Sequence, residues 1–126
     1  MTHTPSANRQ KAERLGRVAE TRAAMMLRLK GYRVVAQRWK SPSGEIDLII
    51  RRGSVIAFVE VKAREKADDA LVSVSHHQRR RIVIAAHHWL AANPDATECD
   101  CRFDIVTVTP YQWAQHIPNA FAADDQ

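Results

Sequence analysis

The sequence predicts an α/β fold in which a mixed sheet is flanked by helices, with elements in the order α-β-β-β-α-β. Three observations indicate this class. A proline-free segment rich in Ala, Leu, Met and Arg lies near the start, two alternating apolar runs follow it, and a second helical stripe precedes one more apolar run. Because two amphipathic helices each need a wall to pack on, they are expected to cover both faces of the sheet.

The first helix and the first strand are expected early in the chain. Residues 1–7 are polar and are predicted to be disordered. The helix is expected over about residues 8–30, where strong helix formers dominate, and Gly31 ends it in the usual C-terminal position. The apolar run at 32–36 predicts the first strand, and a Ser/Pro/Gly turn cluster follows at 41–44.

Two strands, a loop and the start of a second helix are expected in the middle of the chain. Alternating apolar residues predict strands at 45–51 and 55–63, and the charged, irregular stretch 64–74 predicts a loop. Ser75 and Gln78 have capping-box spacing just ahead of an apolar run, so the second helix is expected to begin at Ser75.

The second helix is expected to end at Asn93, because Pro94 follows it. A fourth strand is predicted at 102–108, closed by Pro110, and 111–126 is expected to be a weakly specified tail. We expect a single domain covering 1–126, since this length suffices for one hydrophobic core. The apolar stripe of the second helix consists of Ile82, Ala85, Ala86, Trp89 and Leu90.

Composition favours a soluble cytoplasmic protein with a polyanionic partner. The net charge is +5, from 19 Lys and Arg against 14 Asp and Glu, and 45% of the residues are hydrophobic. No apolar run reaches the roughly 18 residues of a membrane span, and no signal peptide is visible. Cys99 and Cys101 are expected to be free thiols in a reducing compartment. A basic protein with no such partner remains the alternative.

Parity within the predicted hairpin brings three charged side chains together. If the apolar positions of both strands face one side, a two-residue turn at 53–54 places Asp47 opposite Glu60, with Lys62 beside them. A four-residue loop would make Asp47 diagonal to Glu60. The apolar positions are Ile46, Leu48 and Ile50 in one strand and Val55, Ala57, Val59, Val61 and Ala63 in the other.

These charges predict a cation site. Asp47 and Glu60 are expected about 5 Å apart, where two carboxylates repel by roughly 3 kcal/mol. Lys62 offsets part of this repulsion, and Mg²⁺ or Mn²⁺ held by carboxylate and backbone carbonyl oxygens would offset all of it. The alternative is an ordinary solvated face of an antiparallel hairpin. Against that alternative, the charged face also carries the apolar residues Ile49, Ile56 and Phe58.

Glu20 is predicted to point inward from the first helix. Its helical neighbours are small or apolar, so its stripe is the natural face to lie against the sheet. An inward carboxylate needs a cation or a hydrogen-bond donor. The alternatives are a pairing with Arg17 or a position at the rim. The neighbours of Glu20 on this stripe are Gly16, Ala23, Ala24 and Leu27.

The runs GEIDLI, FVEVKAR, AAHHWL and RFDIV, in this order, closely resemble the YraN-like family (UPF0102) over about residues 10–108. The resemblance implies a restriction-endonuclease-like fold with an αβββαβ core and a degenerate PD-(D/E)xK nuclease signature. Asp47 matches the aspartate of that signature, Glu60 and Lys62 match its ExK, and Glu20 matches the acidic residue of the first helix.

This resemblance implies Mg²⁺- or Mn²⁺-dependent hydrolysis of phosphodiester bonds in DNA or RNA. Asp47, Glu60 and the carbonyl of Val61 would hold the metal, and Glu20 would ligate it directly or through water. Lys62 would orient or activate the attacking water and stabilise the developing charge.

A nucleic-acid surface is expected around the start of the second helix. Three consecutive arginines there oppose the helix dipole, and a phosphate would offset them. A solvated face is the alternative. The chain departs from the family pattern at Gln78 and Arg38, where relatives often carry Lys and Asn. The residues expected to contact nucleic acid are Arg38, Lys40, Gln78, Arg79, Arg80 and Arg81.

Three functions therefore remain open. The leading prediction is a metal-dependent nuclease, for which a homodimer would be one way to reach two strands. The runner-up is a non-catalytic nucleic-acid-binding protein on the same fold. The third is an interaction module whose charged cluster is structural.

Overall fold

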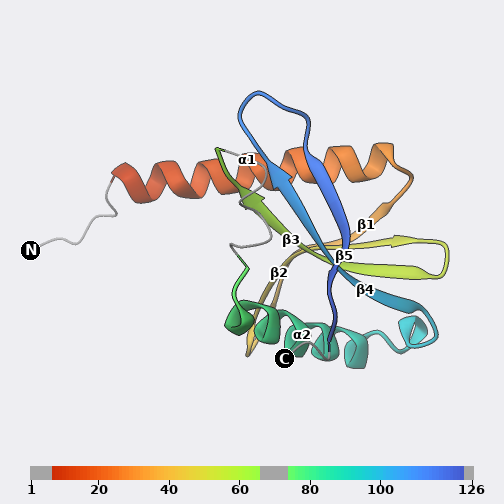
Figure 1. The fold of residues 1–126 in the computed structure, drawn as a ribbon. Helices are drawn as coiled ribbons and strands as arrows, with labels where there is room; N and C mark the ends of the chain where they lie inside the picture. Colours follow the sequence, from red (N-terminus) through yellow and green to blue (C-terminus); the bar gives the residue numbers. More distant parts are fainter. Residues whose placement is uncertain (1–6, 66–73, 124–126) are drawn as a thin grey trace, which may run out of the picture.

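The structure is a computed structural model that describes residues 7–65 and 74–123, and it consists of one mixed five-stranded sheet between two helices. α1 lies across one face and α2 across the other (Figure 1). This arrangement confirms the predicted mixed sheet flanked by helices. The elements are α1 (Ala7–Leu29), β1 (Arg33–Ser41), β2 (Gly44–Arg52), β3 (Val55–Ala63), α2 (His76–Ala92), the short 3₁₀ helix η2 (Pro94–Ala96), β4 (Asp100–Val108) and β5 (Gln115–Phe121).

The strands are arranged in the order β1-β2-β3-β4-β5. β3 and β4 are parallel, because α2 makes the crossover between them, and all other pairs are antiparallel. β1 and β5 are therefore the edge strands.

Each face of the sheet buries its own hydrophobic core. Both faces of the central strands are consequently apolar, as expected for a sheet covered on two sides. The core under α1 includes Ala23, Leu27, Leu48, Ile50, Val59 and Val106. The core under α2 includes Ile49, Phe58, Ile82, Ala86, Trp89 and Phe103.

The predicted hairpin register is confirmed where β2 and β3 pair. Leu48 lies opposite Val59 and Arg52 opposite Val55, which is the register of a two-residue turn at 53–54. The four-residue loop is thereby excluded. The predicted parity is wrong at Ile46, which packs in the core under α2, although Leu48 belongs to the core under α1.

β1 is longer than predicted, because it pairs with β2 as far as the turn at 42–43. The strand contains two irregularities, a register shift between Val34 and Ala36 and a positive φ of 49° at Arg38. Such irregularities bend a strand and re-aim its side chains. Arg38 lies next to the part of β2 where the apolar alternation breaks.

α2 begins and ends as predicted. Ser75 accepts a hydrogen bond from the Gln78 backbone, the Gln78 side chain accepts one from the Ser75 backbone, and Asn93 is the C-cap. No helix in the two described ranges is long and apolar enough to cross a membrane. The predicted disorder of 1–7 lies outside the described residues except at Ala7, where α1 begins. Most of the predicted loop at 64–74 also lies outside the described residues.

The weakly specified tail expected at 111–126 contains a fifth strand that the predicted element order lacks, β5 over Gln115–Phe121. This strand pairs with β4, and the ring of Phe121 stacks on that of Phe103 with centroids 5.1 Å apart. Its sequence contains Pro118 and Asn119, which are poor strand formers, so the local pattern conceals it.

Candidate functional site

The candidate site lies where β2 and β3 separate. Leu48 and Val59 are the last residues of the paired register on this side, and Asp47 comes next. Instead of continuing the ladder, the Asp47 carboxylate accepts a hydrogen bond from the Val61 backbone, with Oδ2 2.8 Å from the nitrogen. The side chain of Asp47 is therefore fixed between the two strands.

Glu60 and Lys62 contribute the opposite side of this gap. They are two residues apart on β3 and so point to the same side. Lys62 Nζ lies 3.5 Å from Glu60 Oε1, and the two side chains are only 12% and 15% exposed, respectively. The predicted convergence of the three charged groups is thus present, in partly buried surroundings.

Burial raises the pKa of Asp47 to about 8, with the charge of Glu60 as the next cause. The hydrogen bond from Val61 acts in the opposite direction. Burial also raises the pKa of Glu60, while Lys62 acts to lower it. Two carboxylates in this position resist being ionised together, so a proton or a cation between them stabilises the pair.

Glu20 approaches the same site from α1, but a cation of the protein already binds it. Arg38 Nε lies 2.6 Å from Glu20 Oε2, and the Glu20 side chain is 17% exposed. The negative charge of Glu20 contributes to the raised pKa values of Asp47 and Glu60, so it acts on both of them. Its partner is Arg38 rather than Arg17. Among residues 7–65 and 74–123, no three Asp, Glu, His or Cys side chains are grouped closely enough to hold a metal ion.

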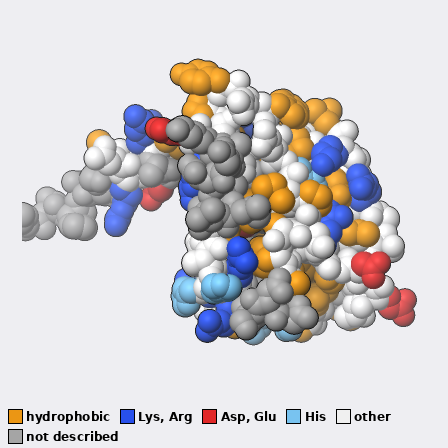
Figure 2. Space-filling view, viewed as in Figure 1, with side chains coloured by type: hydrophobic (Ala, Val, Ile, Leu, Met, Phe, Trp, Pro, Cys, Tyr) orange, Lys and Arg blue, Asp and Glu red, His pale blue; other side chains and the backbone are white. Residues whose placement is uncertain are grey.

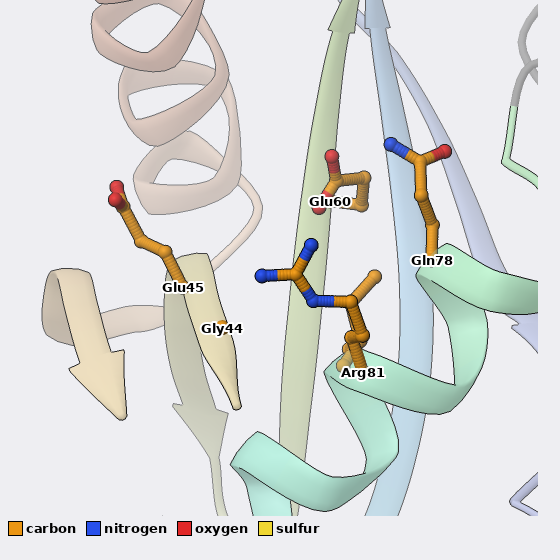
Figure 3. Close-up of a pocket in the computed structure, with 6 residues that line it drawn as sticks. Gly44, Glu45, Glu60, Gln78 and Arg81 are labelled. Atoms are coloured by element: carbon orange, nitrogen blue, oxygen red, sulfur yellow. The ribbon is translucent and has the colours of Figure 1, made fainter. Parts of the chain in front are cut away.

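α2 closes one side of the site and forms a pocket of about 150 Å³ with β2 and β3. Figure 3 shows the Arg81 guanidinium reaching from α2 toward the space between Glu45 and Glu60, with Gln78 one turn earlier on the same helix. Arg81 Nε donates to the Ser43 carbonyl at 2.8 Å, which holds the side chain over the β1–β2 turn.

The other predicted nucleic-acid contacts have different surroundings. Arg79 donates to the Val74 carbonyl at 3.1 Å and lies over the ring of Phe121, so it anchors the start of α2. Arg80 and Lys40 are exposed. Figure 2 shows basic and histidine side chains gathered over the start of α2.

A second buried charge, Asp104, lies on β4 outside the candidate site. It is fully buried, and it accepts two hydrogen bonds from Arg102 and one from His116, at 2.7–2.9 Å. Burial acts to raise the pKa of Asp104, but these donors keep it below its ordinary value. An aspartate interrupting an apolar strand signals such a network. The pairing of Glu20 with Arg38 has no comparable signal, because the two residues lie on different elements and Arg38 adopts a positive φ that no strand pattern predicts.

The elements that build this site coincide with the part of the chain that is shared with other proteins. A family model described as "Uncharacterised protein family UPF0102" matches residues 19–108, which include Glu20, Asp47, Glu60 and Lys62.

Full-length relatives agree with that match. A UPF0102 protein of Rhodopseudomonas palustris (strain HaA2) is 50% identical over 121 residues, covering 96% of this chain and 94% of its own. UPF0102 proteins of Mesorhizobium japonicum and Rhizobium meliloti are 48% and 47% identical, over 96% and 93% of this chain and 97% and 96% of theirs. With a family model over most of its length and relatives that align almost end to end, this chain belongs to the UPF0102 family.

Proposed function

We propose that the protein is a metal-dependent nuclease that hydrolyses phosphodiester bonds in DNA or RNA. The observation that carries the proposal is the Asp47–Glu60 pair, two half-buried carboxylates whose pKa values both rise, with Lys62 beside them. Carboxylates whose pKa values are raised by burial and by a neighbouring charge are typical of functional sites.

The donor set fits a hard divalent cation. Asp47, Glu60 and the Val61 carbonyl would supply oxygen ligands, which suit Mg²⁺ or Mn²⁺. The hydrogen bond from the Val61 backbone orients the Asp47 carboxylate before any ion binds. When bound, the ion would supply Lewis acidity and a water of lowered pKa. Glu20 would act through a water, because Arg38 already occupies one of its oxygens.

Lys62 would orient the attacking water and stabilise the negative charge that develops on the phosphate oxygens. Its ammonium group has three donors, and only the 3.5 Å contact with Glu60 constrains it in the described structure. A compact, mobile cation can follow charge as it develops on the phosphate oxygens. The contact with Glu60 would then keep Lys62 beside the reacting group.

The start of α2 would bind the phosphate backbone next to this centre. Arg81 borders the same pocket as Glu60, and Arg80 is exposed on the adjoining surface. Both lie in the second turn of α2, next to the helix N-terminus, whose dipole also favours an anion. Lys40 on β1 would extend this surface.

The test is a Mn²⁺ titration read by melting temperature and by cleavage of labelled oligonucleotides. The wild type is expected to melt at higher temperature with Mn²⁺ and to cleave, and Asp47→Ala to do neither. Glu98→Gln is the matched control, because it removes an exposed carboxylate far from the pocket and should behave like the wild type. Wild-type protein that gains no stability from millimolar Mn²⁺ or Mg²⁺ would refute the metal site.

A non-catalytic nucleic-acid-binding protein is the second candidate, and the Arg38–Glu20 ion pair favours it. With Glu20 neutralised, the site offers two carboxylates rather than three to an ion. Such a protein would bind nucleic acid in a salt-dependent manner without cleaving it. Arg80→Ala with Arg81→Ala should then weaken binding and lower the salt slope by about one for each phosphate contact that is lost.

A further inference from the structure

Two large aromatic side chains project from the loop between β4 and β5, residues 109–114. Tyr111 is 99% exposed and Trp113 is 60% exposed. Hydrophobic side chains protrude at the top of the view in Figure 2, where Figure 1 places this loop. Tyr and Trp bury a large area whenever packing allows it, so their joint exposure on one short loop needs a cause.

The loop itself is held firmly by the fold. Arg22 of α1 donates to the carbonyls of Thr109, at 2.9 Å, and of Gln112. Thr109 and Ala114 are buried and anchor the two ends. The backbone is therefore tied down at its centre and at both ends, while the two rings between these anchors remain in solvent.

The loop leaves the sheet at the same end as the candidate site. β4 runs parallel to β3, with Thr107 beside Lys62 and Val108 beside Ala63. The Arg64 backbone also donates to the Val108 carbonyl at 3.0 Å. Strand residues rise about 3.3 Å each, so the loop begins within about 10 Å of Lys62 along the strand direction.

We propose that Tyr111 and Trp113 form a stacking platform for unpaired nucleobases, which makes single-stranded nucleic acid the substrate class of the neighbouring site. This inference rests on the proposed function. Every base has a π face, so aromatic rings bind single strands without sequence preference. In a duplex those faces are already stacked on one another. A rigid loop presents the rings without an ordering cost on binding.

The experiment measures binding in EDTA, so that cleavage plays no part. The probe is a labelled oligothymidylate of about 12 nucleotides, compared with a duplex and with an abasic strand of equal length. The wild type is expected to bind the oligothymidylate at least about tenfold more tightly than the abasic strand, because only the former has bases to stack.

The variant is Tyr111→Ser combined with Trp113→Ser. It is expected to bind the oligothymidylate at least about tenfold more weakly and the duplex within about twofold of the wild type. Leu29→Ser is the matched control, since Leu29 is 76% exposed on α1 and its loss also removes apolar surface. Unchanged melting temperatures would show that both proteins fold.

Equal binding of the oligothymidylate and the abasic strand by the wild type, or no binding at all, would overturn the inference. A double variant that binds the oligothymidylate like the wild type would also overturn it. If that variant differs from the wild type only in its molar mass in solution, the rings serve contact between copies of the chain instead. The nuclease proposal fails separately. If the protein binds the oligothymidylate through the two rings but never cleaves with Mn²⁺, the stacking platform stands and the nuclease proposal is refuted.

Discussion

Replacing Asp47 by Asn should stabilise the metal-free protein at alkaline pH. Asn has the same shape, and its side-chain oxygen can still accept the hydrogen bond from the Val61 backbone. The substitution removes only the charge that burial and Glu60 disfavour. The effect therefore isolates the electrostatic cost of the site from its geometry.

The magnitude follows from the pKa of Asp47, which rises from an ordinary 3.8 to about 8. Each pKa unit corresponds to about 1.4 kcal/mol, so the ceiling is about 6 kcal/mol. Because Asp47 and Glu60 titrate together, we expect a gain of about 3 kcal/mol, which is the repulsion of two carboxylates about 5 Å apart at an effective dielectric near 20.

The sign of the pH dependence follows from the raised pKa. Between about pH 4 and pH 8 the folded protein binds a proton that the unfolded chain has released, so the stability of the wild type falls as the pH rises through this window. Asp47→Asn has no such proton. The gain in stability should be largest near pH 9 and small near pH 4.

Urea denaturation at both pH values measures this difference, with Glu98→Gln as the control for the loss of one negative charge. With saturating Mn²⁺ the ranking should reverse, because the wild type then has two carboxylates for the ion and the variant has one. If Asp47→Asn is less stable than the wild type at about pH 9 without metal, the carboxylates are not forced together and the reasoning fails.

Three further results are expected. Lys62→Ala should abolish cleavage but keep the rise in melting temperature with Mn²⁺, because the oxygen ligands remain; loss of both effects would contradict the assigned role. His116→Ala should lower the free energy of unfolding by about 1–3 kcal/mol in urea titrations, since it removes a donor to the buried Asp104. Ser75→Ala should cost about 1 kcal/mol through loss of the N-cap of α2, and an unchanged urea midpoint would refute that contribution.

Local patterns predicted most of the fold because its central elements depend on local rules. The hairpin register follows from Gly53 with a positive φ of 61° in a two-residue turn, together with apolar alternation on both sides. The start of α2 follows from the reciprocal hydrogen bonds of Ser75 and Gln78. β5 escaped prediction because its pairing with β4, rather than its own residues, makes it a strand.

Part of the candidate site could also be predicted from the sequence. Strand alternation places Glu60 and Lys62 on one face, since side chains two residues apart share a face, and the two-residue turn predicts Asp47 next to Glu60. The three groups do lie together, although the ladder ends at Leu48 and Val59 and the Asp47 side chain accepts from the Val61 backbone instead. Their burial and the raised pKa of Asp47 depend on α2 and on the separation of β2 from β3, so neither follows from the hairpin pattern.

The amino-acid order thus dictates the elements, the hairpin register and the meeting of two carboxylates with a lysine, because each depends on residues close together in the chain. Packing alone decides that Glu20 binds Arg38, that Asp104 joins Arg102 and His116, and that Tyr111 and Trp113 stay in solvent. The contacts of Glu20 with Arg38 and of Asp104 with His116 join different elements of the chain. Such contacts depend on the order of the strands, on bends in the backbone and on which side chains lie within reach of one another. Local periodicity in the sequence encodes none of these three.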